Sequence, residues 1–313
     1  MVKLLRIPIL RSLSAMTYCV LLSALFLLLV LGLPANTTAM RDYQLSSAQY
    51  HILLLIVVIP IVASWFAAFY GYTRIRQYAQ SLKKSSDSGA FHHLADGNAW
   101  IAWGLPVPAI LTITLNTLAD AHPNLKPTAI IITNYINLLI PLVAFTLISA
   151  GSRDLASRAS IRVSLASSRS IMVVFASLGV LFCYLTFRNF DLTTVSSSHN
   201  PYFLPIWLVV ASITIPYLYA WLAGLLAAYE IAALGKQAKG LLYSKALRLF
   251  ALGLIAVIAS SIALQYVNSG ISRTGHLSLN SRLLTTYLIR VVAVVGYLLM
   301  ADGARSLRKI EEV

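Results

Sequence analysis

Charge is what this chain has least of. Only 11% of its 313 residues are charged, and just 10 of them are Asp or Glu, whereas apolar residues make up 58%. A soluble domain has roughly 25% charged and about 45–50% apolar residues. The composition therefore excludes an ordinary soluble domain and favours a membrane protein.

Groups that carry catalysis or hold cofactors are also scarce. The two cysteines, Cys19 and Cys183, lie in separate apolar runs and are too few for a disulfide framework, so we interpret both as small core residues. The chain lacks the GxxxxGK[ST], HExxH, GxSxG and GxGxxG motifs. No apolar run contains two histidines for haem, and His92, His93 and Asp96 are too few ligands for zinc. We expect no enzyme activity, no cofactor and no metal.

Long hydrophobic runs are the feature present in excess. Eight of them are about 20 residues long, which is the length of a helix that crosses a bilayer. They do not alternate as the strands of a membrane barrel would. We expect an all-α protein with eight transmembrane helices, near residues 14–33, 50–72, 99–119, 127–150, 170–188, 202–228, 246–267 and 283–303.

The basic residues divide the connecting segments into two classes. Most precede the first run or follow the second, fourth, sixth and eighth, and few lie between the others. Because basic loops stay in the cytoplasm, we expect both termini there, in a plasma membrane. Topology and contact with anionic lipid headgroups then account for the net charge of +14 without nucleic acid.

The expected spans form two similar sets. The residues Ile59, Pro60, Trp65, Ala67, Ile75 and Lys83 return 156 positions later as Ile215, Pro216, Trp221, Ala223, Ile231 and Lys239. Tyr135, Gly151 and Arg153 return 152 positions later as Tyr287, Gly303 and Arg305. Four spans per half give both halves one orientation, as in transporters with parallel repeats. We expect a first four-helix repeat over 1–151, a cytoplasmic linker over 152–169 and a second repeat over 170–313.

Matched residues in the second and sixth runs predict central packing helices. Pro60 and Pro216 fall at equivalent positions inside these runs, where proline bends a helix, and Trp65 and Trp221 follow five residues later. Small residues that include Gly71 and Gly224 recur after them and permit close helix approach. A pair of hinges for a rocking motion is the alternative interpretation.

A small set of polar residues inside the runs is the candidate site. Arg290 lies about 10 Å inside the last run, where a charge is costly, and it could bind an anionic substrate group or extend outward to the headgroups. Asn116, Asn134, Asn137 and Gln265 could line a cavity between the halves or join helices by hydrogen bonds.

Three further expectations concern the cytoplasmic side. We expect residues 85–98 to form a polar loop. Glu230 and Asp302 are expected to face the headgroups, with an Arg74–Glu230 ion pair as the alternative. The absence of a deeper acid weakens proton coupling.

The sequence thus favours a transporter or permease for a small solute or lipid, with the path at the interface of the repeats. The alternative is a structural or accessory subunit of a membrane complex, held by a membrane protein partner or as a homo-oligomer. The two repeats support the first function only by analogy of architecture.

Overall fold

A computed structural model describes most of the apolar part of the chain. It covers residues 14–32, 46–82, 87–122, 126–159, 206–237, 241–266 and 279–311, with the isolated positions 173 and 177. Within these ranges the regular structure is entirely helical. The helices are α2 (Ala15–Leu31), α4 (Ser47–Ser81), α5 (Ser88–Gly104), α6 (Pro106–Ala121), α7 (Lys126–Arg158), α9 (Ile206–Gln237), α10 (Leu241–Tyr266) and α11 (Leu279–Glu311).

Six candidate spans are long and apolar enough to cross a membrane. They lie in α4, in α5 and α6 taken together, and in α7, α9, α10 and α11, while α2 is a shorter apolar helix. The prediction of an all-helical, multi-pass membrane protein is therefore confirmed for the described residues. The expected fifth span, 170–188, lies outside them apart from positions 173 and 177.

The helices extend well beyond the apolar runs from which they were predicted. The run 50–72 becomes α4, which ends at Ser81, and the run 127–150 becomes α7, which ends at Arg158. Hydropathy does not detect these extensions because the helices continue into the basic segments. The first seven residues of the expected linker 152–169 consequently belong to α7.

The prediction of a polar loop over 85–98 is wrong from Ser88 onward. This segment is the first half of α5, and its side chains pack inward, with Ala90 and Ala95 at 0% and 2% exposed. The helix ends at Gly104 because Pro106 cannot continue it, and α6 begins at this proline. The polar residues that suggested a loop, His92 and His93, lie on the exposed face.

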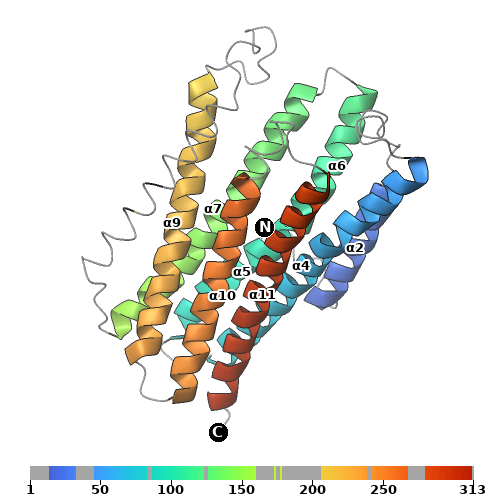
Figure 1. The fold of residues 1–313 in the computed structure, drawn as a ribbon. Helices are drawn as coiled ribbons and strands as arrows, with labels where there is room; N and C mark the ends of the chain where they lie inside the picture. Colours follow the sequence, from blue (N-terminus) through green and yellow to red (C-terminus); the bar gives the residue numbers. More distant parts are fainter. Residues whose placement is uncertain are drawn as a thin grey trace, which may run out of the picture.

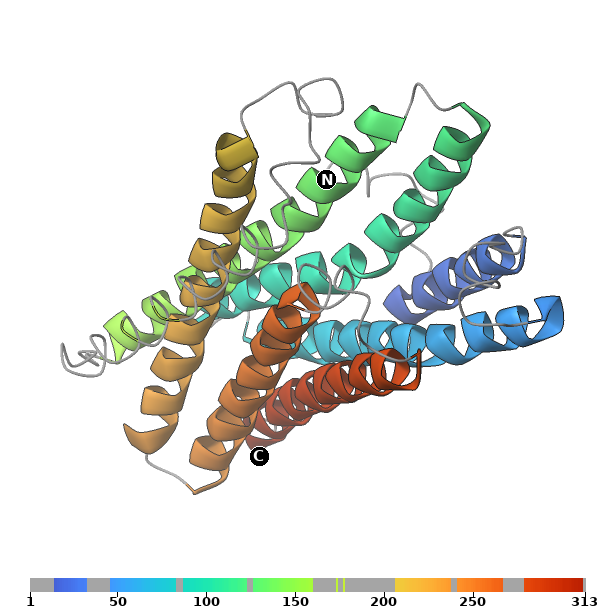
Figure 2. The ribbon, with the colours of Figure 1, turned by 45° about the horizontal axis from the view of Figure 1, so that its top comes forward.

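Six of the described spans pack as a closed ring. Around it, α4 contacts α5, α5 contacts α7, α7 contacts α9, α9 contacts α10, α10 contacts α11, and α11 returns to α4. The remaining helix α2 packs outside the ring against α4 and α6 (Figures 1 and 2). Each ring helix is thus held by two neighbours.

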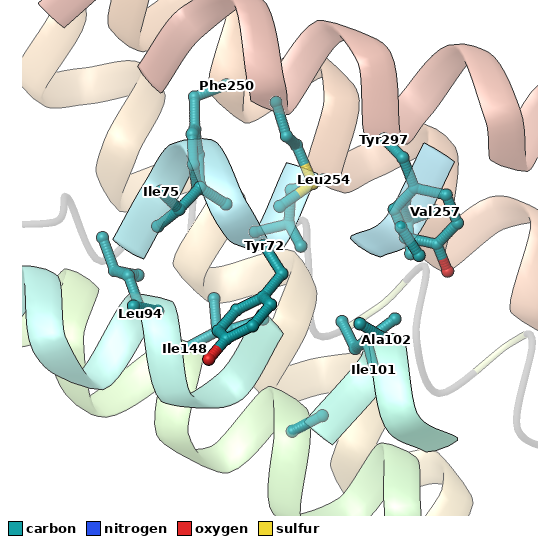
Figure 3. Packing of buried hydrophobic residues seen from close by; sticks show 14 of the residues in the cluster. Tyr72, Ile75, Leu94, Ile101, Ala102, Ile148, Phe250, Leu254, Val257 and Tyr297 are labelled. Atoms are coloured by element: carbon teal, nitrogen blue, oxygen red, sulfur yellow. The ribbon is translucent and has the colours of Figure 1, made fainter. Parts of the chain in front are cut away.

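The centre of the ring is filled by side chains. Tyr72 and Ile75 of α4, Leu94 of α5, Phe250 of α10 and Tyr297 of α11 belong to one apolar cluster (Figure 3). Burial of this kind stabilises helix packing in a membrane through close van der Waals contact.

One end of the bundle, which we call the basic end, gathers the ends of α4, α7, α9 and α11 and the starts of α5 and α10 (Figure 1, bottom). The following described cationic residues lie there: Arg74, Arg76, Arg153, Arg158, Lys236, Lys245, Arg248, Arg305, Arg308 and Lys309. The segments that the sequence placed on one side of the membrane therefore meet at one end of the molecule.

Candidate functional site

Arg290 lies on α11, inside its apolar part. It is the seventh residue of the candidate span that begins at Leu284, which places it about 9 Å along the helix from the start of that span. Its side chain is partly buried, and its Nε is fully buried without a hydrogen-bond partner among the described residues. A guanidinium donor is therefore left unsatisfied at membrane depth.

The packing of α11 on α10 sets the level of Arg290. The helices cross where a Cβ on Gly253 would lie 2.5 Å from the carbonyl oxygen of Gly296. Since α10 and α11 run in opposite directions, Arg290 is level with the stretch of α10 next to Ser260 (Figure 1). The Ser260 hydroxyl donates at 2.7 Å to the Val257 carbonyl of its own helix.

Gln265 and Arg290 lie at different depths along the bundle axis. Gln265 is twelve residues past Gly253 on α10, whereas Arg290 is six before Gly296 on α11, so the two are about 9 Å apart along the bundle axis. About one turn before Arg290, α11 contacts α4, where the Tyr287 hydroxyl donates to the Ile56 carbonyl.

The three candidate asparagines occupy the other side of the ring. Asn116 is on α6, and Asn134 and Asn137 are on α7, whose partners are α5, α6 and α9. Asn137 is exposed, although its neighbour Leu138 is 5% exposed and buried. The side chains of Asn116 and Asn134 lie outside what the structure describes.

The candidate packing residues lie where two helices meet. Trp65 and Trp221 are each 1% exposed. The Trp65 ring contacts Phe26 of α2, with ring centroids 4.8 Å apart, and the Trp221 Nε1 donates to Ser261 Oγ of α10 at 3.3 Å. Pro60 and Pro216 both lie inside continuous helices.

The two glycines of this set permit close helix contacts. A Cβ on Gly71 would lie 3.3 Å from the Tyr297 carbonyl oxygen, and one on Gly224 would lie 2.8 Å from Ile258 Cδ1.

A second polar cluster joins α7 to α9 near the basic end. Glu230 is 7% exposed, and its Oε2 accepts a hydrogen bond from Ser152 Oγ. Its Oε1 lies 3.9 Å from Nε of Arg153, whose side chain is 64% exposed. The expectation that Glu230 faces the headgroups is wrong, because α7 continues far enough to cover it. Its counter-ion is Arg153 rather than the alternative, Arg74.

Asp302, in contrast, is exposed as expected. Near the start of α5, Asp87 forms a separate surface ion pair, with its Oδ1 3.8 Å from Nη1 of Arg158.

No protein-family model matches this chain, and neither a curated protein nor a solved structure is similar to it. Its chemistry must be inferred from the residues themselves. Over the described ranges, no three His, Cys, Asp or Glu side chains converge in a way that could hold a metal ion. Among the described residues, two arginines have a buried Nε without a partner, Arg290 in the apolar part of α11 and Arg74 near the basic end. The other buried charged group in the described ranges is the carboxylate cluster at Glu230.

Proposed function

We propose that this protein is a transporter for a small solute or lipid that carries an anionic group, built from two parallel four-helix repeats. The single observation that carries the function is Arg290, a cation at membrane depth with a buried Nε that no described residue satisfies. A charge at the centre of a membrane helix costs about 2.5–3.5 kcal/mol on insertion scales. A bound anion would offset that cost, and such residues commonly mark substrate paths.

The pattern of helix contacts supports the duplicated architecture. With α4 equivalent to α9, α5 to α10 and α7 to α11, every contact of the ring has a counterpart: α4–α5 matches α9–α10, and α5–α7 matches α10–α11. Two contacts join the proposed halves, α7–α9 and α4–α11. Under the same equivalence each of them corresponds to the other. A twofold axis along the bundle would produce this pattern.

The glycine contacts support the same equivalence at the level of atoms. In the first half, a Cβ on Gly97 would meet the Ala144 carbonyl oxygen and Ile148, and one on Gly151 would meet the Ala90 carbonyl oxygen. In the second half, Gly253 meets the Gly296 carbonyl oxygen and Met300, and Gly303 meets the Ala246 carbonyl oxygen. These residues are related by the sequence offsets of 156 and 152.

The direction of the helices supports an eight-span topology with the basic end in the cytoplasm. Both α7 and α9 run toward the basic end (Figure 1). The eight-span topology connects them through a crossing back to the opposite end, for which the apolar run 170–188 has the required length. Both termini would then lie on the cytoplasmic side, as the basic segments favour.

Cysteine accessibility tests whether a hydrated path reaches Arg290. With Cys19 and Cys183 replaced by Ser, single cysteines at positions 137, 265 and 290 would be challenged in intact membranes with a water-soluble maleimide. We expect labelling at 290 and at 137, while a cysteine at Ile258, which is 0% exposed in the core, remains protected. Protection at all three test positions, with labelling at a loop control, would remove the transport function.

Ligand binding tests Arg290 itself. Short carboxylic acids would each be added to detergent-solubilised protein, and thermal unfolding would be followed. A ligand at one hundred times its Kd stabilises the folded state by about 2.7 kcal/mol. We expect one of these anions to stabilise the wild type, Arg290→Lys in part, and Arg290→Gln not at all. Equal stabilisation of the wild type and Arg290→Gln would exclude Arg290 from the site.

The second candidate function is an accessory subunit of a membrane complex. The observation in its favour is the filled centre of the ring, where side chains such as Ile75, Ile148 and Leu254 are at most 1% exposed. A dry centre of this kind suits a scaffold. Uniform protection in the cysteine experiment would favour this function over transport.

A further inference from the structure

The two seams between the proposed halves carry different charges. At the α7–α9 seam, Glu230 is held by Ser152 and lies within 3.9 Å of Arg153. An acid, a hydroxyl donor and an arginine therefore meet near the basic end. This seam neutralises its own charge.

The equivalent positions at the α4–α11 seam contain no acid. Subtracting 156 from Glu230 gives Arg74, while adding 152 to Ser152 and Arg153 gives Ala304 and Arg305. The α7–α9 seam thus has an acid, a serine and an arginine. The α4–α11 seam has an arginine, an alanine and an arginine at the equivalent positions.

The packing of α4 on α11 places these residues along the seam. Gly71 faces α11, because a Cβ there would lie 3.3 Å from the Tyr297 carbonyl oxygen. Arg74 lies three residues after Gly71, on the same face of α4. Ala304, which is 1% exposed, lies two turns after Tyr297 on the same face of α11, with Arg305 beside it.

Neither arginine has an acidic partner among the described residues. Arg74 donates from Nη1 to Gln77 Oε1 at 3.2 Å and lies over the Tyr70 ring at 5.0 Å, yet its Nε is buried without an acceptor. Arg305 is exposed, and no described ion pair joins it to Asp302, which lies three residues earlier. Among the described residues, the seam therefore has one buried unsatisfied donor, Arg74 Nε, and two arginines without an acidic partner.

We propose that the α4–α11 seam binds a phosphate-bearing anion between Arg74 and Arg305, most simply the headgroup of an anionic lipid. Guanidinium groups match the geometry of phosphate oxygens. Basic sites between transmembrane helices on the cytoplasmic side commonly bind lipid phosphates. In this site the phosphate supplies the negative charge that the Glu230 carboxylate supplies at the other seam. The site rests on the duplicated architecture proposed above, and it is independent of Arg290 and of transport.

The chain supplies the design of its own test. The double substitution Arg74→Glu with Ala304→Ser rebuilds at this seam the acid, hydroxyl and arginine of the other, and so fills the site with an internal carboxylate. Arg305→Gln removes one of the two charges with little risk to folding, because that side chain is exposed. Arg76→Gln is the matched control, since it removes an exposed charge from the same helix two residues away.

Lipid binding would be measured on the full chain by thermal unfolding and by native mass spectrometry. The wild type and the variants would be titrated with phosphatidylglycerol, with phosphatidylcholine and with inorganic phosphate. We expect phosphatidylglycerol to bind the wild type and Arg76→Gln alike, and to bind the double variant and Arg305→Gln roughly tenfold more weakly or worse. Stabilisation by inorganic phosphate as well would identify the phosphate group itself as the ligand, whereas stabilisation by phosphatidylglycerol alone would identify a lipid.

Several outcomes separate this site from the other proposals. Unchanged lipid binding in both Arg305→Gln and the double variant would overturn it. Arg290→Gln should retain the lipid effect, so that failure of the transport function leaves this result intact. A double variant that fails to fold, together with an Arg305→Gln variant that folds and binds lipid weakly, would retain the site but reject the repeat equivalence used to design the double variant.

Discussion

Glu230 is the residue whose surroundings are most demanding. A carboxylate that is 7% exposed must keep its hydrogen bonds, because an unsatisfied buried charge costs far more than an exposed one. Arg153 is mostly in solvent and 3.9 Å away, so its attraction is screened. The hydrogen bond from Ser152 is therefore the main local compensation for this charge.

Removal of that hydrogen bond should be measurable. We expect Ser152→Ala to lower the free energy of unfolding by about 1–3 kcal/mol, because the Glu230 carboxylate loses a buried donor. Glu230→Gln should cost less, since a neutral amide oxygen can still accept the bond from Ser152. Unfolding by denaturing detergent in mixed micelles would measure both. Ser157→Ala, at an exposed serine on the same helix, is the control and should stay within about 0.5 kcal/mol of the wild type. Equal values for Ser152→Ala and Ser157→Ala would mean that Glu230 is solvated.

Single residues differ in how far the sequence alone could place them. Trp65 and Trp221 could be predicted as packing residues because they recur at equivalent positions inside apolar runs. The Glu230 cluster could not, because Ser152 and Arg153 belong by hydropathy to a linker and reach Glu230 only when α7 continues past the apolar run. Arg290 stood out as a charge in an apolar run, but its unsatisfied Nε depends on packing that no local pattern encodes.

At the scale of elements, the ring is held by close approaches of helix backbones. Gly97 and Gly253 are the points of contact within each half, and a Cβ at either would lie under 3.0 Å from a backbone carbonyl oxygen of the neighbouring helix. Small residues at such crossings let helices pack closely in lipid. Since the obstructing atoms belong to the backbone, rotation of a side chain cannot relieve the clash.

Alanine at these crossings should therefore be destabilising, against its usual helix preference. We expect Gly253→Ala to lower the free energy of unfolding by about 1–3 kcal/mol through overpacking, and Gly97→Ala to do the same in the first half. Gly89→Ala is the matched control, because nothing lies within 4 Å of a Cβ there, and alanine should stabilise that helix by up to about 1 kcal/mol. The same unfolding experiment would measure all three. A neutral effect of Gly253→Ala would show that α10 and α11 pack less closely than described.

The elements themselves were only partly predictable. Hydropathy located the apolar part of each described span, since about 20 apolar residues are required to cross a bilayer. It misplaced the start of the third span, because the first two turns of α5 alternate buried alanines with exposed histidines and read as polar on average. The break before Pro106 corresponds to Gly-Leu-Pro in the sequence. Hydropathy does not reveal it, because the residues on both sides are apolar.

At the scale of the whole molecule, the two seams between the proposed halves differ in their chemistry. The α7–α9 seam contains a buried carboxylate and its donors, and the α4–α11 seam contains Arg74 and Arg305 in the equivalent positions. Under the proposed duplication, shared origin would account for the matching helix contacts, and later divergence would account for the different charges. A lipid phosphate at the second seam would restore the electrostatic balance that the first seam achieves within the protein.

The overall topology gives the last prediction. Because α7 ends at the basic end and α9 starts at the opposite end (Figure 1), residues on either side of the run 170–188 should lie on opposite sides of the membrane. A single cysteine at Ala159, just after α7, should react with a membrane-impermeant maleimide only after the membrane is opened. One at Ser198, before α9, should react in intact cells. A cysteine at Ala159 that reacts from outside would reverse the orientation deduced from the basic residues. Reaction of both positions from one side would rule out the expected fifth span, 170–188, and with it the equal four-helix halves on which the paired seams depend.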